Sequence, residues 1–170
     1  MKNISNMSHS MTEPKELMIM MIIMFIAGLL SSMNIWVDKI SDFKFHLNDV
    51  YMSLLMCSWS LLFMGIYYTN INLFLIGIIM TIMIIYCIRN QLFINETQYI
   101  KGMIPHHSMA VLMSKNLLEK KFNDNTIDIS NQIKTLASHI INTQEHEIKL
   151  MKTRLNNKEK IEKIKNSIYI

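Results

Sequence analysis

Two adjacent histidines and the methionines around them are the residues of this chain whose types and spacing could do chemistry. The stretch from Met103 through His106 and His107 to Met113 reads MIPHHSMAVLM. In a helix, a turn of about 100° per residue brings these four side chains onto roughly one third of the circumference. Thioether sulfur is a soft metal ligand and imidazole a borderline one. The combination therefore suits copper, and Cu(I) in particular, better than magnesium or calcium.

A second set of candidate side chains lies downstream, again on one helix face. Gln144, Glu147 and Met151 fall within roughly 60° of each other at helical spacing. Met151 would add another thioether, whereas the two polar side chains fit better as acceptors that hold an imidazole ring in place. The sequence thus predicts a metal site between two helices, supported by Glu147 and Gln144, with the ligands His106, His107, Met103, Met113 and Met151.

A packing role would account for part of the same pattern. Methionines at helical spacing commonly fill a hydrophobic core. Adjacent histidines on an apolar stripe are harder to explain in this way, because burying imidazoles without partners costs free energy. Two functions stay open: metal binding, with copper sequestration or delivery as its purpose, or a non-catalytic helical module for interaction and assembly.

The remaining histidines are weaker candidates. His139 and His146 fall on the opposite face of the second helix from Glu147, so we expect them to be solvated. His46 lies in a loop that the alternation of membrane spans places on the same side as the candidate site, which it could approach.

Two amphipathic helices must position the candidate ligands. Asn95 and Gln98 form a capping-box pattern, which predicts a helix from about Glu96. Turn-forming residues at 120–125 end it, and apolar residues at helical spacing predict a second helix from about residue 127 to at least 155.

The two helices are expected to fold back as an antiparallel hairpin. We assign this hairpin domain to residues 90–157 and a basic tail to residues 158–170. A hairpin of this size buries too little surface to be stable alone. Self-association into a four-helix bundle is the simplest completion, and it makes the chain a homo-oligomer.

Three uncharged apolar segments precede the hairpin, at residues 17–37, 50–68 and 71–88. A membrane-spanning helix needs about 20 apolar residues, so each segment is long enough to span. We therefore predict an all-α, multi-pass membrane protein with a three-helix anchor at residues 17–89. The lipid bilayer is its first partner, and residues 1–16 form a flexible polar tail.

Charge and motif content exclude several function classes. The net charge of +4 resides entirely beyond residue 90, with twelve basic and eight acidic side chains there. No recognition motif accompanies these lysines, so we expect no nucleic-acid partner. No nucleophile with a base and no phosphate-binding loop is visible, so we expect no enzyme. A di-iron site would need Glu-x-x-His pairs, and the chain has none.

Two arguments about sidedness disagree. The hairpin side carries Lys39, Lys44, Arg89 and Lys101 against Lys2 and Lys15 on the other, which favours a cytoplasmic hairpin. A short N-terminal tail, however, is easily retained inside. Together with the family resemblance given next, this leads us to expect an extracytoplasmic domain.

The motif MIPHHSMA at residues 103–110, with Met113, Gln144, Glu147 and Met151, resembles the "domain of unknown function 305" family. The apolar spans and residues 89–91 further resemble a membrane-anchored bacterial branch. The resemblance implies a ferritin-like helical bundle, of which this chain supplies half, and a link to copper through secreted members. It implicates the same seven residues. The first loop departs from the branch pattern.

Overall fold

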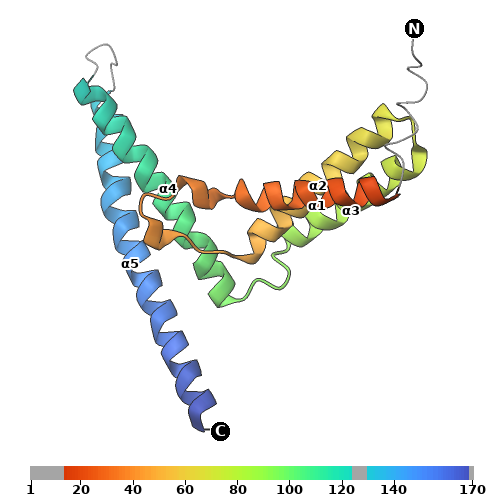
Figure 1. The fold of residues 1–170 in the computed structure, drawn as a ribbon. Coiled ribbons are helices and arrows are strands. Elements are labelled where there is room, and N and C mark those ends of the chain that lie inside the picture. The colour runs from red at the N-terminus through yellow and green to blue at the C-terminus, as the bar shows by residue number, and fades with distance from the viewer. Residues whose placement is uncertain (1–13, 124–129, 169–170) are drawn as a thin grey trace. The chain divides into compact units, whose positions relative to one another are not determined.

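The computed structural model describes residues 14–123 and 130–168, and all regular structure in these ranges is helical, as predicted (Figure 1). The chain divides into two compact units. One comprises Met1–Ser32 and Leu47–Phe93, and the other comprises Met33–His46 and Ile94–Ile170.

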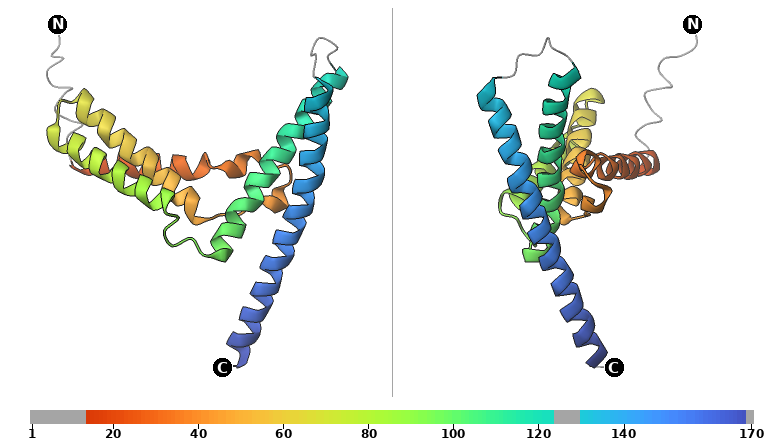
Figure 2. Two further views of the ribbon diagram at one scale, coloured as in Figure 1. Left: turned by 180° about the vertical axis from the view of Figure 1, so that it is seen from behind. Right: turned by 90° about the vertical axis from the view of Figure 1, so that its left-hand side faces the viewer.

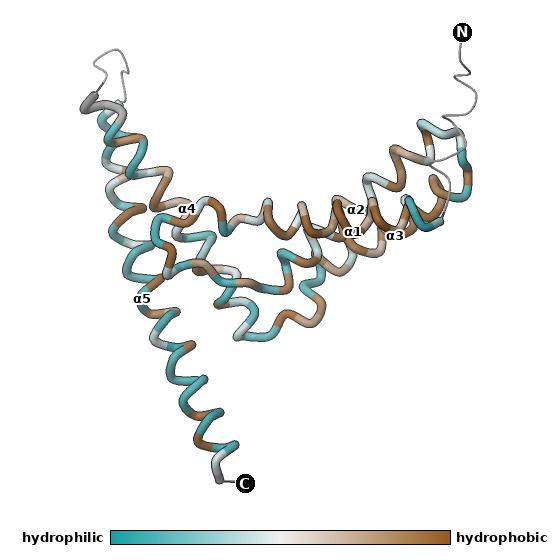
Figure 3. Tube along the Cα trace, viewed as in Figure 1, coloured by the Kyte–Doolittle hydropathy of each residue, from teal (hydrophilic) through white to brown (hydrophobic). Residues whose placement is uncertain are grey.

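Three long helices form the first unit: α1 (Pro14–Leu30), α2 (Leu47–Tyr67) and α3 (Ile71–Arg89). Each is long and apolar enough to cross a membrane, and the first candidate span extends to Trp36. Apolar residues run along all three helices, whereas polar and apolar residues mix in the other unit (Figure 3). Of the predicted tail, residues 1–13 lie outside the described residues, and residues 14–16 are the first turn of α1.

Small residues let these helices approach closely. A Cβ atom added at Gly77 of α3 would lie 2.6 Å from the backbone nitrogen of Leu62, and one at Gly28 of α1 would lie 2.9 Å from Ser53. The buried hydroxyl of Thr81 donates to that of Ser58, 3.0 Å away. Close backbone contact and interhelical hydrogen bonds are the interactions that hold helices together in lipid.

The second unit is built on an antiparallel pair, α4 (Glu96–Asn123) and α5 (Asn131–Ile168), seen from two sides in Figure 2. The side chain of Asn95 accepts from the Gln98 amide at 2.9 Å, as the capping pattern predicts. A hydrophobic core lies between the helices, and Met151 packs against it. The core is formed by Ile100, Ile104, Val111, Ile148 and Leu155.

The ends of this pair differ from the sequence expectation. Helix α4 continues through the first predicted turn residues to Asn123, and residues 124–129 lie outside the described residues. Helix α5 continues through the segment assigned as a basic tail, as far as Ile168. Pro105 is accommodated within α4 and is fully buried.

The segment between the first two spans is ordered and belongs to the hairpin unit. It contains two short 3₁₀ helices, η3 (Met33–Trp36) and η4 (Ile40–Asp42), both in contact with α4. Our sequence-based division counted this segment with the membrane anchor. In the structure its polar side chains bond to the hairpin, for reasons given below.

Close packing at Gly77 leads to a prediction. Gly77→Val should lower the free energy of unfolding in detergent micelles by about 1–3 kcal/mol, because the branched side chain would force α2 and α3 apart. Unfolding by a denaturing detergent, followed by circular dichroism, measures this. The matched control is Ile79→Val on the exposed face of α3, where Ile79 is 64% exposed. Equal stability of the two variants would contradict the packing argument.

Candidate functional site

His107 joins the two helices of the hairpin. Its Nδ1 lies 2.8 Å from the carbonyl oxygen of Met103, one turn earlier in α4, and its Nε2 lies 2.9 Å from Oε2 of Glu147 on α5. Both partners are acceptors, and each of them engages one ring nitrogen of His107. In this arrangement both ring nitrogens of His107 already have protein partners.

His106 points to a different neighbour. Its Nδ1 lies 3.4 Å from Sδ of Met33 in the segment 33–46. Both side chains reach the surface, and the ring centroid of His106 is 6.1 Å from that of His107. His46 is buried against Gly102, where an added Cβ would lie 3.6 Å from its ring, one helical turn before His106. This loop histidine thus does approach the candidate site.

The other predicted residues are spread over different environments. Met151 packs against the hairpin core, whereas Met113 is 56% exposed and Met103 is half-buried. Oε1 of Gln144 is buried without a hydrogen-bond partner among the described residues. His139 and His146 are exposed, as expected from their helix face.

One contact among the described residues joins donors of the kind that Cu(I) favours. A thioether and an imidazole, the donors that Cu(I) favours, meet at Met33 and His106. His107 contacts Met103 and Glu147, and Met151 packs against the hairpin core. Within the described ranges, no three His, Cys, Asp or Glu side chains gather closely enough to hold a metal ion.

A buried carboxylate beside the histidines fastens the segment 33–46 to the hairpin. Asp42, 2% exposed, accepts a hydrogen bond from Ser108 at 2.7 Å and forms an ion pair with Lys152 of α5. Ser108, fully buried, in turn accepts from the Asp38 amide at 2.8 Å. The residue after the two histidines therefore links α4 to the loop.

The surroundings of Asp42 decide its charge state. Burial alone would raise the pKa of this carboxyl. Hydrogen bonds from Lys152 and Ser108, together with the charge of Lys152, outweigh burial and hold the pKa below its ordinary value. Asp42 is therefore ionised at neutral pH.

A second ion-pair group lies alongside the first. Lys115 Nζ is 2.8 Å from Asp38 Oδ2 and 2.9 Å from Glu145 Oε1, so it joins the loop to both helices. Its hydrogen bonds with Asp38 and Glu145 raise the pKa of Lys115, and the hydrogen bond from Lys115 lowers the pKa of Glu145. Lys39 adds a contact to Glu145 at 3.6 Å.

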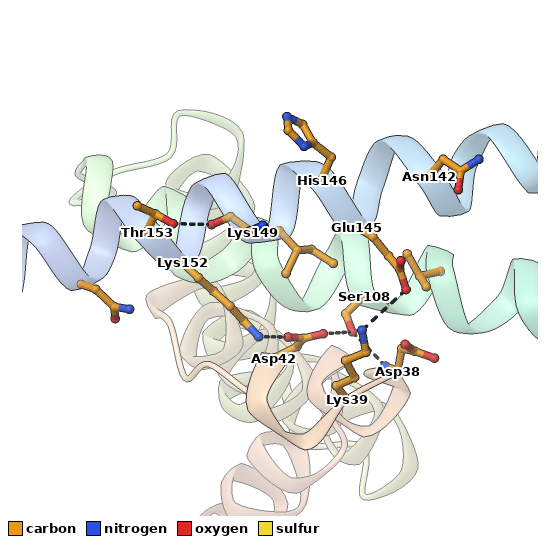
Figure 4. Close-up of a pocket in the computed structure, with 13 residues that line it drawn as sticks. Asp38, Lys39, Asp42, Ser108, Asn142, Glu145, His146, Lys149, Lys152 and Thr153 are labelled. Atoms are coloured by element: carbon orange, nitrogen blue, oxygen red, sulfur yellow. Dashed lines mark hydrogen bonds and ion pairs between the residues drawn. The ribbon is translucent and has the colours of Figure 1, made fainter.

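These charged groups line an open pocket of about 550 Å³ between the loop and α5 (Figure 4). In the close-up, Lys152 reaches down from α5 to Asp42. Asp42 and Glu145 each pair with a lysine that also lines the pocket, and Asp38 pairs with Lys115. The ion pairs around this pocket thus hold the segment 33–46 against the hairpin, within the same unit.

Sequence reasoning missed the loop residues of this site. Met33, Asp38 and Asp42 belong to a segment that looked like a short connection between two spans. The one available signal was that these acidic residues lie in a loop which the alternation of spans places on the same side of the membrane as the lysines of the hairpin.

Comparison with known proteins agrees with the motif. Residues 96–167 match the family described as "Domain of unknown function (DUF305)". Over 161 residues the chain is 39% identical to an uncharacterized protein of Acanthamoeba polyphaga mimivirus, covering 90% of this chain and 97% of that protein. No solved structure matches. The chain belongs to the DUF305 family. Its assignment to a bacterial branch stays a prediction.

The depressed pKa of Asp42 gives a pH-dependent prediction. Asp42→Asn should lower the free energy of unfolding by about 1–3 kcal/mol at pH 7, because a charged hydrogen-bonded group is lost. A carboxyl whose folded pKa is depressed stabilises the fold above its unfolded pKa of about 4 and loses that effect as pH falls through the folded value. The difference between parent and variant should therefore shrink towards pH 3.

Chemical unfolding of both proteins at pH 7 and pH 3 measures this effect. Glu159→Gln is the matched control, because Glu159 is exposed on α5 and has no ion-pair partner among the described residues. Its stability should match that of the parent at both pH values. A parent-to-variant difference for Asp42→Asn that is the same at both pH values would contradict the assignment.

Proposed function

We propose that this DUF305 protein is a membrane-anchored, non-enzymatic protein that binds Cu(I) at the surface around His106, for sequestration or delivery of the ion. The observation that carries the proposal is the contact between the His106 imidazole and the Met33 thioether. These two side chains come from segments 73 residues apart and lie 3.4 Å from each other. Soft sulfur beside imidazole nitrogen is a donor pair suited to Cu(I).

Access and surroundings support this place. His106 is exposed and Met33 is 38% exposed, so the pair lies at the surface of the hairpin unit. Met103 lies one turn before His106 on the same helix and is only half-buried, so it could supply a further thioether. When bound, copper would supply a redox-active or transferable soft cation, while these side chains hold it.

His107 and Glu147 have a positioning role in this proposal. Their contact at 2.9 Å ties α4 to α5 directly beside His106. The hydrogen bond from His107 to the Met103 carbonyl fixes the ring relative to its own helix. A fixed neighbour limits the directions in which the His106 side chain and its helix can move.

A helical assembly module is the second candidate function. Its support is the exposure of large apolar side chains on the hairpin: Met113, Ile133 and Leu136 are 56%, 44% and 52% exposed. The buried Oε1 of Gln144 also lacks a partner among the described residues. A second copy completing a four-helix bundle would cover such a surface.

Copper binding gives the deciding prediction. His106→Ala and Met33→Leu should each weaken Cu(I) affinity of the full chain in detergent by at least about tenfold, since loss of a direct ligand costs no less than loss of a supporting residue. Competition with a Cu(I)-specific chelating dye under reducing conditions measures the affinity.

Met113→Leu is the matched control, because Met113 is an exposed methionine of the same helix. It should bind as the parent does. If His106→Ala binds Cu(I) as tightly as the parent, the copper proposal is wrong. The assembly module would then be the better account, and it requires concentration-dependent self-association that does not depend on metal.

We further propose that the hairpin unit lies outside the cytoplasm, which the family resemblance favours over the charge count. In a Cys57→Ala, Cys87→Ala background, Ser138→Cys places a single thiol at an exposed position of α5. A membrane-impermeant thiol reagent added to intact cells should label it fully. Labelling only after the cells are opened would reverse the orientation. The background protein without the new thiol is the control.

A further inference from the structure

The last three turns of α5 have no partner helix. Glu96, the first residue of α4, pairs with Arg154 at 3.1 Å and with Lys158 at 2.5 Å. Because the helices are antiparallel, α5 passes beyond the start of α4 after Lys158. Residues 159–168 therefore extend by about 15 Å past the hairpin, and the side chains of residues 159–167 are all exposed.

This extension is amphipathic. Ile161 and Ile164, 57% and 59% exposed, lie about 60° apart on one face of the helix. Lys160 and Lys165 flank that face, each about 70° from its centre, whereas Glu159 and Glu162 lie roughly 130° or more away. An apolar stripe bordered by lysines, with acidic residues opposite, is the pattern of a helix that lies at a membrane surface.

The lysines of the extension are available for an external partner. Lys152, Arg154 and Lys158 are engaged with Asp42 and Glu96. In the part of the chain that the structure describes, no carboxylate forms an ion pair with Lys160, Lys163 or Lys165. Arg154, Lys158 and Lys165 instead border a surface hollow that also contains Ile161.

A short linker joins the third candidate span to the hairpin. The third candidate span ends at Arg89 and α4 begins at Glu96. Seven peptide units reach at most roughly 25 Å, so the start of α4 lies no farther than that from the end of the span. The extension of α5 beyond Glu96 thus begins beside the end of α4 that this linker ties to the third candidate span.

We propose that residues 159–168 lie on the bilayer in which the chain is anchored and bind its anionic lipid headgroups. Ile161 and Ile164 enter the boundary between headgroups and acyl chains, and Lys160 and Lys165 contact lipid phosphates on either side. This inference rests on the membrane anchoring and does not depend on copper binding.

Fluorescence quenching tests the proposal with the full chain. In the Cys57→Ala, Cys87→Ala background, Ile164→Cys carries an environment-sensitive fluorophore. The protein is reconstituted in phosphatidylcholine vesicles with or without about one third phosphatidylglycerol, together with a lipid that bears a nitroxide near the headgroup. Both leaflets have the same composition, so the result does not depend on sidedness.

We expect quenching at least about threefold stronger in anionic than in neutral vesicles, since each lysine near an anionic surface contributes favourably. Added salt should reduce the difference, because it screens the attraction. Asn166→Cys is the matched control: it lies two residues away, on the opposite face, and should be quenched much less. Lys160→Glu with Lys165→Glu in the Ile164→Cys protein should abolish the anionic enhancement.

Three outcomes would overturn the proposal. Equal quenching at positions 164 and 166 would mean that no specific face meets lipid. Equal quenching in neutral and anionic vesicles would remove the role of the lysines. Absence of quenching, with pyrene labels at position 164 forming excimers, would show that a second copy of the chain covers the stripe instead.

Discussion

A carboxylate can be buried only where other groups offset the hydration it loses. Asp42 meets that condition through Lys152 on α5 and Ser108 on α4. Because these partners come from both helices of the hairpin, the single carboxylate holds three pieces of chain in one arrangement. The position of Met33 beside His106, and with it the candidate metal site, depends on this anchor.

In the two-histidine motif, side chains that hold the unit together thus lie directly beside one that reaches the surface. Ser108 bonds to the loop, His107 bonds to Glu147 on α5, and His106 reaches the surface next to Met33. At 100° per residue, three consecutive side chains point to three different neighbours. Neighbouring residues can therefore fasten the unit together while one of them stays available for a ligand.

The arrangement also explains why a two-helix hairpin can be ordered with so small a core. Five buried apolar residues lie between α4 and α5, and the segment 33–46 adds polar contacts to α4 along one side. Lys115 also joins Asp38 to Glu145. The loop takes part of the place that a third helix would occupy in a larger bundle, which leaves the opposite face of α5 exposed.

The sequence by itself determined the elements of this protein. Uninterrupted apolar runs indicated the three spans, and the Asn95 capping pattern and apolar periodicity indicated the hairpin, because both signals are local and repeat along the chain. Helical spacing also predicted that Glu147 lies on the face of the second helix that meets the histidines. Tertiary structure alone decided that Met33 meets His106, that His107 is held by two acceptors and that Asp42 is buried. The contacts of Met33 and Asp42 join residues 66 to 110 positions apart, and they depend on a loop whose sequence has no periodicity from which its docking could be predicted.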